Sequence, residues 1–235
     1  MQAPEIAVGG ARLRLLPERA ALLVDHATLL VADAHIGKAV SFRRLGVPVP
    51  QGTTSEMLVR LSALIDRTGA RHVVFLGDLL HSARSRAPAT VAAVQRWRAR
   101  HAVVELTLVR GNHDRHAGDP PADWGIEALA GPLRMPGLDR LALAHHPEPV
   151  AGAYVIAGHV HPAVRLGGAI DSLRLPCFHF GTAVGVLPAF GAFTGMHVVR
   201  PAPGERIFLV AGDSVRLLPG SPAGSRSPGS PASPA

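Results

Sequence analysis

The sequence predicts an α/β fold of four layers, in which two mixed β-sheets pack face to face and helices lie outside them. In the first half, short β-type runs alternate with two amphipathic helical segments, as in layered α/β proteins. In the second half, short β-type runs follow one another with few helices between them, so we expect a largely antiparallel sheet packed on the first. In both halves of the chain, several strands are expected to end at the same edge of the sheets.

The first half opens with a predicted hairpin, whose strands cover residues 20–24 and 28–32. A loop rich in Gly, Pro and Arg is expected over residues 36–52. Thr53–Thr68 predicts a helix with one apolar face, begun by a capping box of Thr53 with Glu56 and ended by the following glycine. A strand, a second helix and a third strand follow over His72–Leu76, Pro88–Arg100 and 103–109.

The second half is expected to be built from strands. They are predicted over residues 141–144, 154–157, 163–166, 173–180, 196–199, 207–210 and 214–217. Residues 219–235 contain only Pro, Gly, Ser and Ala apart from one arginine, a composition that cannot bury apolar surface. We therefore expect one domain over residues 1–218 and a disordered tail over 219–235.

Composition limits the classes of protein and of site. The chain has 235 residues, 47% of them hydrophobic, without an apolar run long enough to span a bilayer or a secretory signal pattern, so we expect a cytoplasmic protein that does not bind membranes. Cys177 is the single cysteine, which excludes an intrachain disulfide and a site of four thiolates. The net charge of +7 suits a phosphate-rich partner such as a nucleic acid, but an Arg-rich, GC-biased composition would also produce it.

Side chains that bind metals follow five of the predicted strands. The segments are Asp33-Ala34-His35, Gly77-Asp78, Gly111-Asn112-His113-Asp114, His145-His146-Pro147 and Gly158-His159-Val160-His161. Ligands of α/β proteins bind at the carboxyl ends of the strands, and imidazole with carboxylate is the donor set of Mn, Fe and Zn centres. Each segment alone is weak, since Asp-x-His and Gly-Asp pairs often form ordinary turns. The ordered set of five predicts a metal centre.

These segments, in this order, resemble the signature of the calcineurin-like metallophosphoesterase superfamily, over roughly residues 29–195. More narrowly, the chain resembles the bacterial family described as ligase-associated DNA damage response endonuclease PdeM. The residues that carry this resemblance are Ala34–Glu56, Gly77–Arg86, Arg110–Pro121, Ser172–Gly181 and Leu187–His197. The resemblance implies the metallophosphoesterase version of the four-layer α/β/β/α sandwich, and it implies two divalent metal ions, Mn before Fe or Zn.

The resemblance also implies a role for each residue. Asp33, His35 and His161 would hold one metal, and Asn112, His145 and His159 the other, with Asp78 bridging both. His113 would act beside the scissile phosphate as proton donor or charge stabiliser. Either His145 or His146 could be the ligand, and we choose His145 because it directly follows its strand. Two such metals would activate a water for in-line attack on phosphorus.

The loops beside these motifs carry basic residues that suit phosphate oxygens. Candidates for substrate binding are Lys38, Arg43, Arg44 and Arg115, although each is equally consistent with a solvent-exposed charge. The favoured function is a phosphodiesterase or DNA endonuclease in DNA repair, with a DNA ligase and a helicase as partners by resemblance. The alternatives are a phosphatase or phosphodiesterase acting on small molecules such as nucleotides, and a non-catalytic, metal-binding adaptor in a repair complex.

Overall fold

The structure is a computed structural model, and it describes residues 3–44, 46, 52–167 and 172–219. Apart from Pro219, the predicted tail lies outside these residues, as does part of the predicted loop over 36–52. Among the helices that the structure describes, none is long and apolar enough to cross a membrane.

The first sheet has seven strands that lie in chain order. They are β1 (Glu5–Val8), β2 (Ala11–Leu16), β3 (Ala20–Leu23), β4 (Thr28–Val31), β5 (His72–Leu76), β6 (Glu105–Val109) and β7 (Glu127–Leu129). Strands β1 to β4 pair antiparallel, and β4 to β7 pair parallel, so the sheet is mixed. The predicted hairpin is β3 and β4, joined through a 3-10 turn over Val24–His26.

The helices of the described residues all come from the first half of the chain. They are α1 (Lys38–Arg44), α2 (Thr53–Thr68), α3 (Pro88–Arg100) and α4 (Asn112–Ala117), with further 3-10 turns over Ala83–Arg86 and Ala122–Trp124. The bounds of α2 and α3 match the prediction. The capping box is wrong, because the chain enters α2 through the left-handed Gly52 (φ 86°), whose carbonyl accepts the Glu56 N–H.

Helix α1 forms where a loop was predicted. Its Ala39 and Ser41 are buried, and Ser41 Oγ lies 3.0 Å from Ser82 Oγ beside the turn over Ala83–Arg86. The segment has no regular apolar period, so its helical state depends on these tertiary contacts, which override weak local preference.

The second sheet has eight strands. They are β8 (Leu141–Leu143), β9 (Tyr154–Ala157), β10 (Pro162–Gly167), β11 (Ser172–Phe180), β12 (Val184–Val186), β13 (His197–Val198), β14 (Arg206–Ala211) and β15 (Ser214–Leu217). The antiparallel expectation for this half is only partly right, since β8, β9 and β12 are parallel to one another. The reason is connectivity: the β10 and β11 pair is inserted in the chain between β9 and β12. The predicted α/β fold with two mixed sheets is confirmed.

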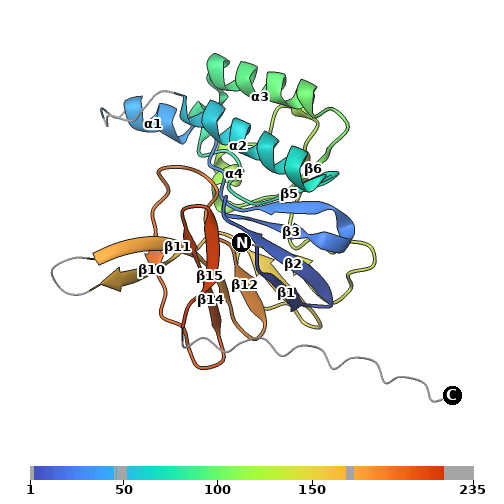
Figure 1. Cartoon of the computed structure of the whole chain (residues 1–235). Coiled ribbons are helices and arrows are strands. Elements are labelled where there is room, and N and C mark those ends of the chain that lie inside the picture. The colour runs from blue at the N-terminus through green and yellow to red at the C-terminus, as the bar shows by residue number, and fades with distance from the viewer. Residues whose placement is uncertain (1–2, 45, 47–51, 168–171, 220–235) are drawn as a thin grey trace.

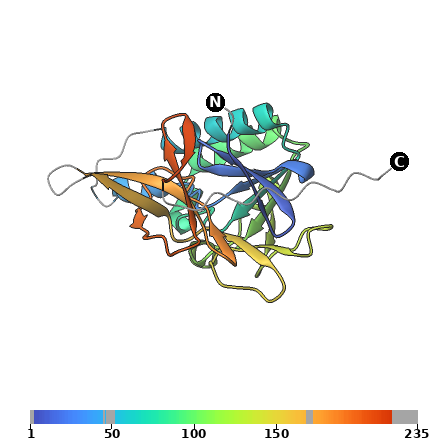
Figure 2. The same cartoon turned by 60° about the horizontal axis from the view of Figure 1, so that its bottom comes forward.

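Two buried layers hold the fold together. On the first sheet, alternate residues face opposite sides: Leu29 and Val31 pack toward α2 and α3, whereas Leu30 and Ala32 pack toward the second sheet. Figure 1 shows the helices over one side of the first sheet and the β-rich half on the other. Figure 2 shows the paired β10 and β11 extending from one side of the body.

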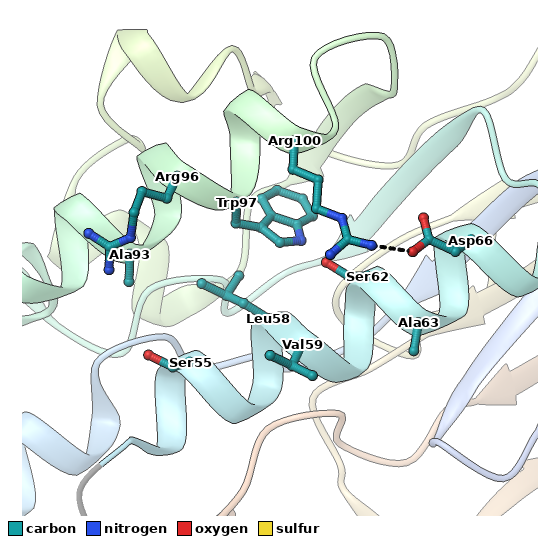
Figure 3. Close-up of a pocket in the computed structure, with 10 residues that line it drawn as sticks. All are labelled: Ser55, Leu58, Val59, Ser62, Ala63, Asp66, Ala93, Arg96, Trp97 and Arg100. Atoms are coloured by element: carbon teal, nitrogen blue, oxygen red, sulfur yellow. Dashed lines mark hydrogen bonds and ion pairs between the residues drawn. The ribbon is translucent and has the colours of Figure 1, made fainter.

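Helices α2 and α3 lie side by side, with a shallow groove on their outer surface (Figure 3). Leu58 and the Trp97 indole form its floor, and Arg100 Nη2 bridges the two helices to Asp66 Oδ2 at 2.6 Å. The groove contains none of the residues that the sequence singles out for chemistry. Its contacts join α2 to α3.

Candidate metal centre

The strand ends bring all seven predicted metal ligands and His113 to one edge of the sandwich. The loops after β4 and β5 stay in register beyond the sheet, because the N–H groups of Asp33 and His35 bond the carbonyls of Gly77 and Asp78 at 3.3 and 2.8 Å. The second sheet is joined to them across the core, where the His159 N–H donates to Asp33 Oδ2 at 2.9 Å. The sheet topology thus places residues more than 100 positions apart in contact.

One cluster consists of Asp33, His35 and His161, and one ligand-type atom of each lies within 4.8 Å of the others. Asp33 Oδ1 and His161 Nε2 are 3.5 Å apart. Three buried atoms here, Asp33 Oδ1 and the Nε2 atoms of the two histidines, have no hydrogen-bond partner. A buried polar atom without a partner is costly, and three together fit a cation that all of them would bind.

A second cluster consists of Asn112, His145 and His159. His145 Nδ1 donates to the Leu76 carbonyl at 3.0 Å, which leaves Nε2 with a lone pair. This Nε2 lies 3.0 Å from Asn112 Oδ1 and 3.1 Å from His159 Nδ1. A nitrogen lone pair that faces an amide oxygen cannot make a hydrogen bond. Two ligand atoms that each lie about 2.1 Å from the same cation, with a right angle between the two bonds, are about 3 Å apart. This cluster also fits a metal.

Asp78 lies between the two clusters and faces both. Its Oδ2 is 3.8 Å from His35 Nε2, and its Oδ1 is 3.5 Å from His145 Nε2. Asp78 Oδ1 also accepts the backbone N–H of His113 at 2.9 Å, and the His113 Nε2 atom is 3.9 Å from Oδ2. A carboxylate in this position can bridge two cations.

Burial favours the neutral form of three imidazoles of the centre, which is the form that binds a metal. Burial lowers the pKa of His35 to about 2 and that of His145 to about 4. Burial also lowers the pKa of His159. For His161, burial lowers the pKa as well, but its contacts with Asp33 raise the pKa by more, so the pKa of His161 lies above its ordinary value.

Backbone strain is concentrated at the same residues. Eight non-glycine residues in the described part of the chain have positive φ, and five are predicted ligands: Asp33, His35, Asp78, His159 and His161. Left-handed backbone costs of order 1–3 kcal/mol for a non-glycine residue and persists where the surroundings enforce it, most often at functional sites. Five such residues in one cluster indicate a site shaped for binding.

The glycines before the ligands are required by close approach. A Cβ on Gly77 would lie 2.2 Å from His145 Nδ1, and one on Gly111 would lie 2.3 Å from Asp78 Oδ1. Each glycine therefore leaves room for a ligand that comes from a different strand.

No protein-family model matches the sequence, and neither does any curated protein. Among solved structures, the chain is similar to the Pseudomonas putida nuclease MPE, with 40% identity over 92% of this chain and 100% of that one, and a TM-score of 0.81. The chain belongs to the metallophosphoesterase family.

Two more distant structures are similar in parts. One is the phosphoesterase Yfce from E. coli, with 16% identity over 81% of this chain and 97% of that one, and a TM-score of 0.41. The other is a protein of unknown function from Aquifex aeolicus, with 17% identity over 57% and 78% and a TM-score of 0.36.

As a metallophosphoesterase, the protein is a hydrolase of phosphoester bonds, and its buried His and Asp groups can bind metal. His146, the alternative to His145, is half-buried, and one of its ring nitrogens lies within 4.8 Å of ligand-type atoms of His145 and His159, with its ring 4.4 Å from that of His159. His145 is the one that contacts both aspartates, at 3.8 Å from Asp33 and 3.5 Å from Asp78.

Two supporting residues of this metallophosphoesterase were not assigned a role from sequence. Asp114 is buried and accepts the N–H groups of Leu80 and Gly111 at 3.0 and 2.9 Å, which ties the loops after β5 and β6 together. Burial raises the pKa of Asp114 to about 6. Its position three residues after Gly111, at the start of α4, is the sequence signal, since an acidic residue there caps a helix.

His81 is the other supporting residue. Its ring stacks on that of His113 with centroids 5.0 Å apart, and its carbonyl accepts a hydrogen bond from His113 Nδ1 at 3.0 Å. This contact turns His113 Nε2 toward Asp78. A single histidine in a loop offers no sequence signal for such a role.

The four candidate substrate residues lie on the two short helices of this edge. Lys38 begins α1, is half-buried and lines one pocket with His35. Burial lowers its pKa against the opposing attraction of Asp78 and Asp33. Arg43 is exposed on α1, which ends at Arg44, and Arg115 is exposed on α4.

Proposed function

We propose that this metallophosphoesterase hydrolyses phosphodiester bonds with two divalent metal ions, and that its substrate is DNA. The observation that carries the proposal is the pair of clusters on either side of Asp78. In the first cluster, buried ligand-type atoms lack hydrogen-bond partners, and in the second, the lone pair of His145 Nε2 faces the Asn112 amide oxygen. The family resemblance makes Mn²⁺ the metal we favour. Fe and Zn are the alternatives, because imidazole, carboxylate and amide ligands suit all three metals.

In this proposal, Asp33, His35 and His161 would hold one ion, Asn112, His145 and His159 would hold the other, and Asp78 would contribute to both. Bound there, the ions would supply a hydroxide nucleophile at neutral pH and neutralise charge on the phosphoryl oxygens. Backbone carbonyls orient the ligands: Gly195 accepts from His161 Nδ1 and Leu76 from His145 Nδ1, so both Nε2 atoms point inward.

His113 is the catalytic residue of the proposal. The His81 carbonyl accepts the Nδ1 proton, so a second proton on Nε2 of the imidazolium would face the reacting phosphate. In that form His113 can donate a hydrogen bond to a phosphoryl oxygen or a proton to the leaving oxygen. General acids of this kind contribute about 10²–10⁴-fold to rate.

DNA is favoured over a small phosphoester for two reasons. The similar Pseudomonas putida structure is that of a nuclease. In addition, Lys38 and Arg43 lie on α1 and Arg115 lies on α4, the short helices that follow two of the ligand loops, and a net charge of +7 suits a polyanion. A place in DNA repair, beside a ligase and a helicase, follows from the family resemblance and belongs to the same proposal.

The test is hydrolysis of bis-p-nitrophenyl phosphate, p-nitrophenyl phosphate and labelled single- and double-stranded DNA, each with Mn²⁺ and with EDTA. His113→Ala should lower the metal-dependent rates about 10²–10⁴-fold. His197→Ala is the matched control, because His197 is exposed on β13. At 100 times Kd, Mn²⁺ should also stabilise the wild type by about 2.7 kcal/mol.

Each contrary result has a distinct meaning. Turnover of the aryl diester without cleavage of DNA would replace the nucleic-acid substrate by a small phosphodiester. Bound metal with no turnover of any substrate would favour the adaptor. Activity that survives EDTA would contradict the metal mechanism.

A further inference from the structure

The segment between β12 and β13 crosses the metal centre and is fastened to it at both ends. The N–H groups of Phe190 and Gly191 donate to the carbonyls of Ala32 and Asp33 at 2.8 and 3.0 Å. At the other end, the Gly195 carbonyl accepts the hydrogen bond from His161 Nδ1 at 3.0 Å. Residues 192–194 are therefore held directly over the loops that carry the predicted ligands.

The base of this segment is rigid. Phe190 is fully buried, and the Arg60 guanidinium lies over its ring at 4.1 Å while also donating to its carbonyl. A Cβ on Gly191 would lie 2.5 Å from the Ala34 carbonyl oxygen, so the chain here is in tight contact with the ligand loop. The position of the next residues is set by this packing.

Phe193, at the tip of the segment, points its ring outward. Its side chain is 48% exposed, and its backbone has a φ of 58°. It lines one pocket with the predicted ligand His35 and with Lys38, Thr53 and Thr54, so it lies beside the loop that carries His35. An exposed ring adds little to the core, and a left-handed backbone disfavours a residue with a side chain, so stability does not account for Phe193.

Among the Phe, Trp and Tyr residues that the structure describes, Phe193 is the one with an exposed side chain. The other aromatic residues near the site or in the core do not compete with it. Trp124, Phe178 and Phe180 are buried in the core, and the half-buried Phe42 packs beside Lys38 Nζ and the His81 ring. Met196, three residues after Phe193 in the chain, is also exposed.

We propose that Phe193 stacks on the nucleobase next to the scissile phosphate, while Lys38 faces the phosphate itself. This inference rests on the proposed function, since it assumes a nucleotide-containing diester in the centre. Stacking uses the face of the base and is tolerant of sequence. Because a paired base has both faces covered by its neighbours, the base at Phe193 must be unpaired or turned out of the duplex.

The test compares two esters with the same leaving group, thymidine 5′-(p-nitrophenyl phosphate) and methyl p-nitrophenyl phosphate, which differ in the nucleoside. Phe193→Ala should lower kcat/KM for the thymidine ester about 5- to 100-fold and leave the methyl ester near the wild-type value. Phe193→Trp should retain the preference, and Phe193→Leu should lose most of it. Alanine keeps the positive φ and its strain, so the comparison isolates the ring. Leu173→Ala, at a 58% exposed side chain on β11, is the matched surface control.

A binding measurement without metal separates recognition from catalysis. In EDTA, a fluorescent single-stranded oligothymidylate should bind Phe193→Ala about 5- to 100-fold more weakly than wild type, and an abasic oligonucleotide should not distinguish the two proteins. An equal loss on both esters would overturn the proposal and make the ring a structural part of the loop. Unchanged rates and affinities would also overturn it. Inactivity of the wild type on both esters would instead remove the proposed function, and the inference with it.

Discussion

The two ends of β9, a strand of four residues, follow opposite rules. At the amino end, Tyr154 is half-buried, its hydroxyl donates to the Gly181 carbonyl at 3.0 Å, and its N–H donates to the Arg140 carbonyl at 2.8 Å. At the carboxyl end, His159 and His161 both have positive φ, and the buried His161 Nε2 has no partner.

The difference teaches where to look for function in a fold of this kind. At the amino end the polar groups satisfy one another, which is what a stable structure requires. At the carboxyl end, strain and unpaired polar atoms are retained, which lowers stability in the absence of a ligand. Changes at the carboxyl end should therefore affect activity and metal binding, whereas changes at the amino end should affect only stability.

The largest effect is expected for Asp33→Asn, which follows β4 and contacts His159 beyond the carboxyl end of β9. The side chain is fully buried with Oδ1 unpaired, and Oδ2 accepts the His159 N–H at 2.9 Å, a bond that an asparagine oxygen can keep. We expect hydrolysis to fall by about 10³-fold, or roughly 4 kcal/mol, while the metal-free protein melts at or above the wild-type temperature.

Metal titrations followed by thermal melting check this prediction, because Mn²⁺ should stabilise the wild type and not the variant. Glu5→Gln on β1, whose carboxylate pairs with Arg14 at the surface, is the matched control and should change neither property. A metal-free Asp33→Asn that melts well below the wild type would mean that the buried carboxylate is structural.

An intermediate effect is expected for Gly111→Ala. The added methyl would lie 2.3 Å from Asp78 Oδ1 and 2.6 Å from the Asp78 nitrogen, so the bridging carboxylate must shift. A displacement of about 1 Å at a reacting centre can cost about 10²-fold in rate, and we expect a loss of that order in kcat/KM.

Gly195→Ala is the control for this variant, because a Cβ there meets no atom within 4 Å. It should retain wild-type activity. Equal activities of the two variants would contradict this prediction, because they would show that Asp78 does not need the space that Gly111 leaves.

The smallest effect is expected for Tyr154→Phe at the amino end. The change removes one hydrogen bond and should cost about 1 kcal/mol of unfolding free energy, a fall of about 2–4 °C in Tm. Hydrolysis and metal affinity should not change, as kinetics and melting on the same sample would establish. A clear loss of activity would break the contrast between the two ends.

The sequence predicts this molecule best where a repeating pattern determines the structure. The apolar period of α2 and the apolar run of β5 are set by burial against the sheet, and their bounds match the structure. Helices α1 and α4 escaped prediction, because KAVSFRR and NHDRHA are short and lack that period. Their helical state comes from tertiary contacts and from capping by Asp114.

For the candidate site, the sequence predicts which residues lie at the carboxyl edge, since each follows a recognisable strand. It does not reveal the positive φ of Asp33 or the unpaired Nε2 of His161, because both depend on packing between distant segments. Phe193 was missed for the same reason: only the fold places that loop across the ligands.

The glycines of the ligand loops also constrain how this sequence can change over generations. The space that a side chain on Gly77 would need is filled by His145, and the space at Gly158 is filled by Asp33, whose Oδ2 lies 2.6 Å from the position of a Cβ. A mutation at such a glycine would survive only with a smaller residue opposite, and that second change would remove a ligand. A single substitution at either glycine would therefore abolish function. We expect relatives that keep the activity to keep each glycine together with its partner.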